Sequence, residues 1–293
     1  MRFAKIIFIF LAFLTLNSCG GRQSKTVTTD EIVSIPEGAV SFEYKKGLKR
    51  AILLRAVVND TIKLNALFDT GSFGVSISDS FDIKNNSNKL FYSTDNALNL
   101  KIGNWSYIQE KTEYMDRNHF FFKFHGHDTA LLGWFIFRNR IIKISFQHHY
   151  IMELPNTDNL EDFDCIKIRK IGNSFFVPVT VSVDGKSITE ELLIDTGNNG
   201  CVNFNNNVIL KYNIDTKESK DTESAILRGT ISKIRLNGDT IKVGKNYITD
   251  QYVFFQASES QKYPESGLIG LEFFENYTMI LDFKNEYLYL KPI

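Results

Sequence analysis

Short runs in which apolar and polar residues alternate make up most of the chain after Val40. Alternation with a period of two residues is typical of a β-strand with one buried face, and long runs at helical spacing are scarce. Turn residues interrupt the runs at 57–62, 183–186 and 235–241, and the last two carry Asp-Gly and Asn-Gly. These dipeptides favour tight hairpin turns. The pattern therefore predicts a mainly β protein with hairpins at these three places.

The beginning of the chain has a different pattern. Arg2 and Lys5 precede a short apolar run over 6–16, and Leu16-Asn17-Ser18-Cys19 resembles a lipobox, the sequence cleaved in bacterial lipoproteins. The apolar run is too short to favour a transmembrane helix. We therefore expect a signal peptide over 1–18 and a lipidated Cys19, followed by a flexible tether over 19–39. A plain secretory signal with a chance cysteine is the alternative.

A motif occurs twice, once in each half of the chain. Asp69-Thr70-Gly71-Ser72 and Asp195-Thr196-Gly197-Asn198 each follow a hairpin, and each is followed later by a hydrophobic pair and a glycine, ending at Gly133 and Gly270. The match continues downstream in the pairs Phe137/Phe274, Asn139/Asn276, Ile142/Met279, Ile144/Leu281, Phe146/Phe283 and Tyr150/Tyr287. Two ordered motifs at similar spacing indicate an internal duplication. We place the two copies at 40–157 and 158–293, joined by the polar stretch 155–159.

Two apolar residues, Asp-Thr-Gly and a later hydrophobic-hydrophobic-Gly together form the signature of aspartic proteases. From Val40 to Ile293 the chain resembles the retropepsin-like group, in the duplicated single-chain form also seen in pepsin. The resemblance implies a two-lobed acid-protease-like β-barrel fold with pseudo-twofold symmetry and a short helix after each later glycine. It also implies an endopeptidase in which Asp69 and Asp195 activate a water, without a cofactor or a metal.

The resemblance assigns supporting roles to further residues. Thr70 and Thr196 are expected to interlock the two loops, Gly71 and Gly197 to supply backbone N–H groups, Ser72 to bond Asp69, and Gly133 and Gly270 to pack beside the loops. Asn198 departs from the small residues usual at its position. Candidate flap residues, which would cover a substrate, are Tyr92 and Gly229, the latter within 227–230. Two neighbouring carboxylates cannot both ionise easily, and this lets the pair act as acid and base together; the aspartic-protease pair is the standard example of this effect.

Composition limits the range of partners. The 293 residues hold 34 basic and 34 acidic side chains, and a neutral chain gives no reason to expect nucleic acid as a partner. His125-Gly126-His127 is compatible with a metal site, but no third ligand stands at a set spacing, so an exposed strand over 121–127 is the preferred interpretation. Cys165 and Cys201 either pair or remain separate thiols. With both lobes in one chain, catalysis does not require a dimer.

The sequence thus predicts an aspartic endopeptidase that acts on peptides or proteins. It would be held to the inner or outer membrane of a bacterial cell envelope by its lipid, facing the periplasm or the cell surface. Two alternatives stay open. One is a peptide-binding lipoprotein that has lost efficient hydrolysis, since Asn198 departs from the family pattern. The other is an enzyme that processes a single dedicated partner. For either aspartate alone, a turn-capping Asp beside a glycine is also a sound interpretation.

Overall fold

A computed structural model of the chain describes residues 35–45, 50–81, 91–126, 128–217, 219–226, 229–258 and 265–293. The predicted signal peptide, Cys19 and the part of the tether before Ile35 lie outside these residues, as do His127 and the candidate flap residues Leu227 and Arg228. Ile35–Ile293 forms one unit. Within the described residues no helix is long and apolar enough to cross a membrane.

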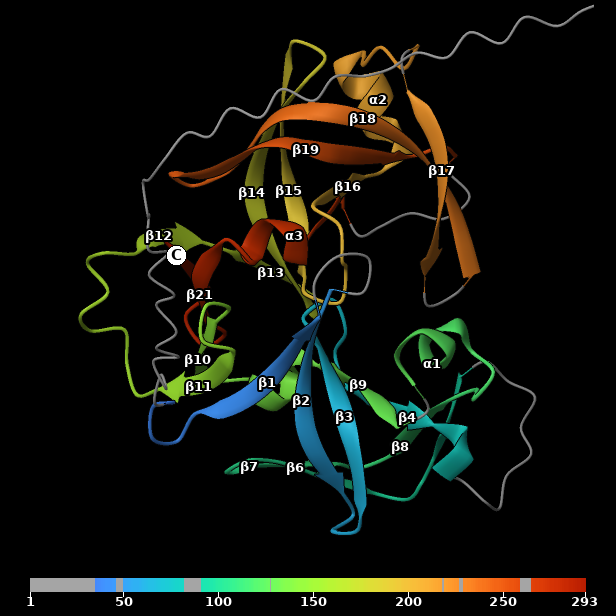
Figure 1. Ribbon diagram of the computed structural model, residues 1–293, viewed down its shortest axis with the longest axis vertical. Helices are drawn as coiled ribbons and strands as arrows, with labels where there is room; N and C mark the ends of the chain where they lie inside the picture. The colour runs from blue at the N-terminus through green and yellow to red at the C-terminus, as the bar shows by residue number, and fades with distance from the viewer. Residues whose placement is uncertain are drawn as a thin grey trace, which may run out of the picture. The chain divides into compact units, whose positions relative to one another are not determined.

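The first half of the described chain is built from short strands (Figure 1). They are β1 (Val40–Lys45), β2 (Ala51–Val58), β3 (Ile62–Asp69), β4 (Val75–Ser78), β5 (Phe91–Thr94), β6 (Leu98–Ile102), β7 (Trp105–Gln109), β8 (Thr112–Met115), β9 (Thr129–Gly133), β10 (Ile141–Ser145) and β11 (Tyr150–Leu154).

The second half has longer strands (Figure 1). They are β12 (Asp164–Lys167), β13 (Arg169–Ile171), β14 (Ser174–Val183), β15 (Lys186–Asp195), β16 (Val202–Phe204), β17 (Lys220–Ile226), β18 (Gly229–Val243), β19 (Asn246–Gln256), β20 (Gly267–Gly270), β21 (Tyr277–Asp282) and β22 (Tyr287–Pro292). The helices of the described residues are short. They are η2 (Asp79–Phe81), α1 (Phe120–His125), η3 (Trp134–Phe137), α2 (Asn206–Tyr212) and α3 (Leu271–Phe274).

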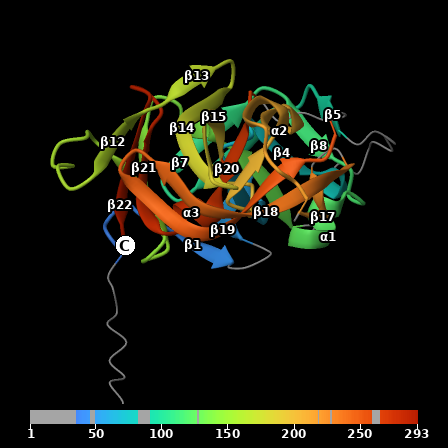
Figure 2. The same ribbon diagram turned by 90° about the horizontal axis from the view of Figure 1, so that it is seen from above.

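The strands form two sheets. In the second half, β14, β15, β20, β16, β19 and β18 pair in that order, and an additional β14–β18 pairing closes them into a six-stranded barrel. The barrel strands overlap when the molecule is viewed from above (Figure 2). The other sheet is large and mixed, and runs β12-β22-β21-β10-β11-β1-β2-β3-β9-β4-β8-β5 with β6 and β7 attached to β2. The fold is therefore mainly β, as the alternating pattern predicts.

The large sheet contains strands from both halves. β10 pairs antiparallel with β21, so that Ile142 lies opposite Leu281 and Ile144 opposite Met279. In the repeat, Ile142 corresponds to Met279 and Ile144 to Leu281. The pairing is therefore reciprocal: Ile142 faces the counterpart of Ile144, and Ile144 faces the counterpart of Ile142. Backbone pairing therefore joins the two copies of the repeat directly.

One hydrophobic core extends through both halves. Trp134 of η3 packs edge-on against Phe175 of β14 with ring centroids 4.7 Å apart and stacks on Phe283 at 5.5 Å. Its indole N–H donates to the carbonyl of Asn173 at 2.9 Å. A large aromatic side chain buried in this way contributes much apolar contact while its polar N–H stays satisfied.

Two predicted hairpins are confirmed. β2 and β3 pair as an antiparallel hairpin around Asn59 and Asp60, whose φ angles are 50° and 61°. β14 and β15 pair around Asp184 and Gly185, with φ of 53° and 66°. Positive φ at both central residues is the geometry of the turn that matches the twist of a hairpin, and Asn, Asp and Gly adopt it most easily.

The hairpin predicted at 235–241 is wrong, because β18 continues through Asn237 and Gly238 and turns only at Gly244, where φ is 60°. A Cβ on Gly238 would lie 2.6 Å from Cγ2 of Val253 on the neighbouring strand. Glycine serves here for a close approach between strands rather than for a turn. The strand predicted over 121–127 is also wrong, since helix α1 occupies Phe120–His125. His148 and His149 lie in the turn between β10 and β11.

Candidate active site

Each Asp-Thr-Gly motif begins at the end of a buried strand. Phe68 and Ile194 point into the main core, and strand alternation places Leu67 and Asp69 on one face of β3 and Leu193 and Asp195 on one face of β15. β3 pairs in parallel with β9, and β15 with β20. In these pairings Asp69 lies opposite Gly133 and Asp195 opposite Gly270. The two motifs of each half thus meet in the same register.

The later glycines fit closely against the Asp-Thr-Gly loops. Gly133 N–H donates to the carbonyl of Gly74 at 2.7 Å, and Gly270 N–H to the carbonyl of Cys201 at 2.8 Å. A Cβ on Gly133 would lie 2.3 Å from the carbonyl carbon of Phe73, and one on Gly270 would lie 2.4 Å from the carbonyl oxygen of Gly200. No larger residue fits at either place without moving the backbone.

Thr70 and Thr196 interlock the two loops with matching hydrogen bonds. Thr70 Oγ1 donates to the carbonyl of Ile194 at 2.7 Å and accepts from the N–H of Thr196 at 3.0 Å. Thr196 Oγ1 donates to the carbonyl of Phe68 at 2.9 Å and accepts from the N–H of Thr70 at 3.0 Å. Both threonines are buried. Four hydrogen bonds between buried groups therefore hold the loops in one relative position.

This interlock brings the two aspartates together. A Cβ on Gly71 would lie 2.9 Å from Cγ of Asp195, and one on Gly197 would lie 2.4 Å from Cγ of Asp69. Each glycine thus lies against the carboxyl of the opposite loop, and the missing side chain is what allows the approach. Burial, and then the neighbouring charge of Asp69, raise the pKa of the Asp195 carboxyl well above its usual range.

The two carboxyls have different hydrogen-bond donors. Asp69 is buried, with one oxygen accepting from the N–H of Gly71 at 2.7 Å and the other from the hydroxyl of Ser72 at 2.7 Å. Asp195 Oδ1 accepts from the N–H groups of Gly197 and Asn198, both at 3.0 Å. The Asn198 side chain points elsewhere, because its Oδ1 accepts from the N–H of Gly200 at 2.7 Å. Only Asp69 therefore receives a side-chain hydroxyl from the residue after the glycine.

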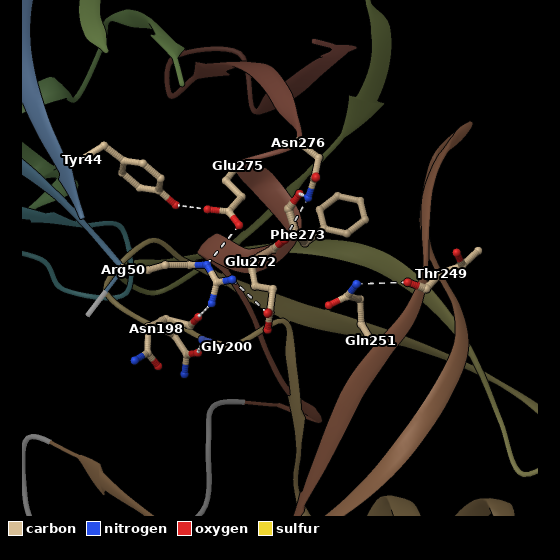
Figure 3. A network of polar contacts seen from close by, with 11 residues as sticks. Tyr44, Arg50, Asn198, Gly200, Thr249, Gln251, Glu272, Phe273, Glu275 and Asn276 are labelled. Carbon is tan, nitrogen blue, oxygen red and sulfur yellow. Dashed lines mark hydrogen bonds and ion pairs between the residues drawn. The ribbon is translucent and has the colours of Figure 1, made fainter. Parts of the chain in front are cut away.

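A charged network, not predicted from the sequence, connects the first half to the second loop (Figure 3). Arg50, just before β2, pairs with Glu272 of α3 at 3.0 Å and with Glu275 at 3.1 Å, and donates to the carbonyl of Asn199 at 3.0 Å. The Tyr44 hydroxyl donates to Glu275 at 2.5 Å, and burial raises its pKa. One guanidinium therefore fixes both α3 and the loop that carries Asp195.

The candidate flap residues occupy different settings. Gly229 is the first residue of β18 and pairs with Ile226 across the β17–β18 hairpin. In both overall views this hairpin extends toward α1 (Figures 1 and 2). Tyr92 lies within β5, with its ring stacked on Tyr114 at 5.2 Å. Their roles as flap residues stay predictions.

Hollows, thiols and possible metal ligands are the remaining candidate features. Surface hollows of about 400 and 310 Å³ are lined by Thr157–Glu161 with Tyr289, and by Asp221–Glu223 with Ser232, Lys233 and Ala257. Cys165 is an exposed free thiol and Cys201 a buried one. In the described part of the chain no group of three or more His, Cys, Asp and Glu side chains is arranged to hold a metal.

No protein family model matches this chain, and no curated protein matches its sequence. The assignment of a function therefore depends on the repeated motifs and on the geometry of the two loops.

Proposed function

We infer that the chain is an aspartic endopeptidase with Asp69 and Asp195 as its catalytic pair. The proposed architecture is a two-lobed acid-protease-like fold in which a pseudo-twofold axis passes between the two Asp-Thr-Gly loops. The reciprocal hydrogen bonds of Thr70 and Thr196 support this axis, and so do the equivalent pairings of Asp69 with Gly133 and Asp195 with Gly270. The β10–β21 pairing supports it independently.

The two carboxyls suit opposite roles in hydrolysis. Asp69 accepts hydrogen bonds from a backbone N–H and from the Ser72 hydroxyl, and it is the proposed base that takes a proton from water. The raised pKa of Asp195 suits the proposed acid, which donates a hydrogen bond to the scissile carbonyl oxygen. The hydroxide formed from the water attacks the carbonyl carbon. The proton taken up by Asp69 then passes to the leaving amine nitrogen as the C–N bond breaks.

The single observation that carries this proposal is the interlock of the two threonines. Turn-capping aspartates beside glycines need no partner loop. Here each loop is held by the side chain of the other, and each glycine lies against the opposite carboxyl. An arrangement of this kind is difficult to explain unless the two carboxyls act together.

Peptide cleavage tests the proposal directly. The purified chain would be incubated with a diverse peptide mixture from acidic to neutral pH, and new peptide ends would be identified by mass spectrometry. We expect cleavage that disappears in both Asp69→Asn and Asp195→Asn. Asp184→Asn, at an exposed hairpin turn, is the matched control and should cleave as the unaltered chain does. Cleavage that survives in either dyad variant would remove that residue from the mechanism.

The peptide-binding alternative has support from Asn198, whose side chain gives Asp195 no hydroxyl. It predicts that a folded chain binds peptides at any pH without producing new ends. A dedicated-substrate enzyme would also leave the mixture intact, but it would cleave one protein in an extract of its own cells.

The cellular location is a separate proposal. We propose that Cys19 carries the lipid and holds the peptidase at a membrane of the cell envelope. Cys19→Ala should move the chain from the membrane fraction to the soluble fraction. Retention of that variant on the membrane would contradict lipid anchoring.

A further inference from the structure

The face of the second-half barrel that carries Asp195 also carries a buried polar cluster. Val202 and Phe204 of β16, Val253 and Phe255 of β19, and Ile234 and Leu236 of β18 pack in or against the main core. Strand alternation turns the residues next to them in the sequence to the other face. Asn203, Lys233 and Gln256 lie there, with exposed fractions of 2%, 5% and 1%.

The same face includes Asp195. Leu193 and Leu268 pack together outside the main core, and Asn203 lies opposite Leu268 in the β16–β20 pairing. Asn203 is therefore two strands from Asp195, a lateral distance of roughly 10 Å. Burial lowers the pKa of Lys233 and the negative charge of Asp195 raises it, so the ammonium and the carboxyl interact electrostatically.

A chain of hydrogen bonds connects Lys233 to the second aspartate. The ammonium of Lys233 donates to Asn203 Oδ1 at 2.5 Å. Because this bond takes the oxygen of the amide, Asn203 presents its NH₂ group on the other side, where Nδ2 donates to Asn198 Oδ1 at 3.4 Å. Asn198 Oδ1 also accepts from the N–H of Gly200, and the Asn198 N–H donates to Asp195.

We propose that Lys233 is a positioning residue for Asp195, acting through Asn203 and Asn198 to fix the second catalytic loop and lowering, with its positive charge, the pH at which the Asp195 acid loses its proton. In the first half, Asp69 is positioned by a direct hydrogen bond from the Ser72 hydroxyl. This inference rests on the proposed function of the aspartate pair.

Burial makes the ammonium effective in this role. Burial lowers the pKa of Lys233 to about 8, while the attraction of Asp195 acts in the opposite direction. Lys233 is thus a cation throughout the acidic and neutral range. A charge with little access to water is screened weakly, so it acts on the Asp195 carboxyl more strongly than a surface lysine would.

The pH dependence of cleavage tests the inference. The proton shared by the aspartate pair is lost on the alkaline limb of the profile of kcat/KM against pH, and a nearby cation promotes that loss. Lys233→Met should move the alkaline limb upward by about one pH unit and lower the maximum about tenfold. Lys233→Arg, which keeps the charge, should leave the limb near its original position.

Controls address the other groups near Lys233. Asp221 and Glu223 of β17 line the same hollow as Lys233, so Asp221→Asn and Glu223→Gln measure their influence on the profile. Gln256 lies opposite Lys233 in the β18–β19 pairing, and its side-chain amide is buried without a hydrogen bond to any described residue. Gln256→Leu should therefore leave the alkaline limb in place. Asn203→Leu, which breaks the chain but keeps the cation, should lower kcat with a smaller shift of the limb.

A titration by NMR keeps the inference separate from the proposed function. The carboxyl carbon of Asp195 would be followed against pH in the unaltered chain and in Lys233→Met, with circular dichroism to confirm folding. An upward shift in Lys233→Met supports the inference even if no peptide is cleaved, in which case only the peptidase proposal fails. An unchanged Asp195 titration in folded Lys233→Met would overturn the inference, whatever the cleavage assay gives.

Discussion

The two Asp-Thr-Gly loops share the threonine interlock and the bond from the glycine N–H to the aspartate, but they differ in the side chain after the glycine. Ser72 turns toward its aspartate and donates to it at 2.7 Å, whereas Asn198 turns away and joins Gly200 and Asn203. A duplicated loop can thus keep the contacts that define its shape while the surroundings of each carboxyl diverge. The difference gives two identical side chains unequal hydrogen-bond surroundings, which suits the opposite roles proposed for them in acid–base catalysis.

The sheet faces that carry the aspartates differ as well. On the first-half face, Leu67 and Leu131 are covered by an apolar cluster to which α1 contributes Phe121 and Phe122. The second-half face carries the polar residues Asn203, Lys233 and Gln256. The sheet face of the first aspartate is thus covered by apolar side chains, whereas that of the second also carries a buried cation. Substitutions at equivalent positions should therefore have unequal effects.

The largest effects should come from the two glycines that the copies share. Gly133→Ala and Gly270→Ala would each place a methyl group within 2.4 Å of backbone atoms, so each should lower the free energy of unfolding by about 3 kcal/mol. Denaturant unfolding followed by circular dichroism measures the loss. Gly200→Ala, where the nearest atom would be 3.2 Å away on a side chain, is the control and should cost far less. If only one of the two alanine variants lost stability, the two loops would not be structurally equivalent.

Removing Arg50 should come next. Arg50→Met leaves Glu272 and Glu275 without their shared cation, and the side chains involved are 17–25% exposed. We expect the free energy of unfolding to fall by about 2 kcal/mol, because two partly buried carboxylates lose the positive charge that offsets their desolvation. The surface pair Lys101–Asp60 provides the comparison, and Lys101→Met should change stability by less than about 0.5 kcal/mol. Equal losses in the two variants would mean that Arg50 does not join the halves energetically.

A smaller effect concerns the charge of Asp195 itself. A carboxyl whose pKa is raised by folding favours the folded state while it is protonated, and this contribution is lost as pH rises from the unfolded pKa through the folded one. Asp195→Asn removes the cost of ionisation, so it should raise stability by about 1 kcal/mol at pH 7. At pH 3 the gain should disappear. Thermal unfolding at both pH values measures it, and a gain that persists unchanged at pH 3 would argue against a raised pKa.

The smallest expected effect comes from making the loops alike. Asn198→Ser supplies Asp195 with a hydroxyl like that of Ser72, which stabilises the ionised carboxyl and should lower the alkaline limb of the cleavage profile by about half a pH unit. A limb that moves upward would show that the side chain of Asn198 matters more than the missing hydroxyl. Ser72→Asn is the reciprocal variant.

Features specified by neighbouring residues could be predicted from the sequence. The hairpins at 57–62 and 183–186 follow from Asn-Asp and Asp-Gly turns between alternating runs, and both are present. Asn237-Gly238 carries an equally strong turn signal, yet β18 runs through it because Gly238 is required for contact with Val253, which is distant in sequence. Local patterns cannot distinguish these two uses of glycine.

The candidate site divides in the same way. The duplicated motif identified Asp69, Asp195 and the threonines that the structure brings together. It could not identify Arg50, whose partners are more than 140 residues away in the sequence. Lys233 could not be identified from the sequence for another reason. Ile234 and Leu236 face the core, so alternation alone places Lys233 on the solvent side of an ordinary strand, and only the folded barrel shows that this face is buried.

The pairing of β10 with β21 has a consequence for how the chain can be divided. Because that pairing, the threonine interlock and the contacts of Arg50 all join the halves without using the connecting segment, covalent continuity between Leu154 and Asp164 is not what holds them together. A chain cut within this segment should give two fragments that recognise each other and restore the site on mixing. The molecule would then behave as an obligate heterodimer whose subunits happen to be translated as one polypeptide.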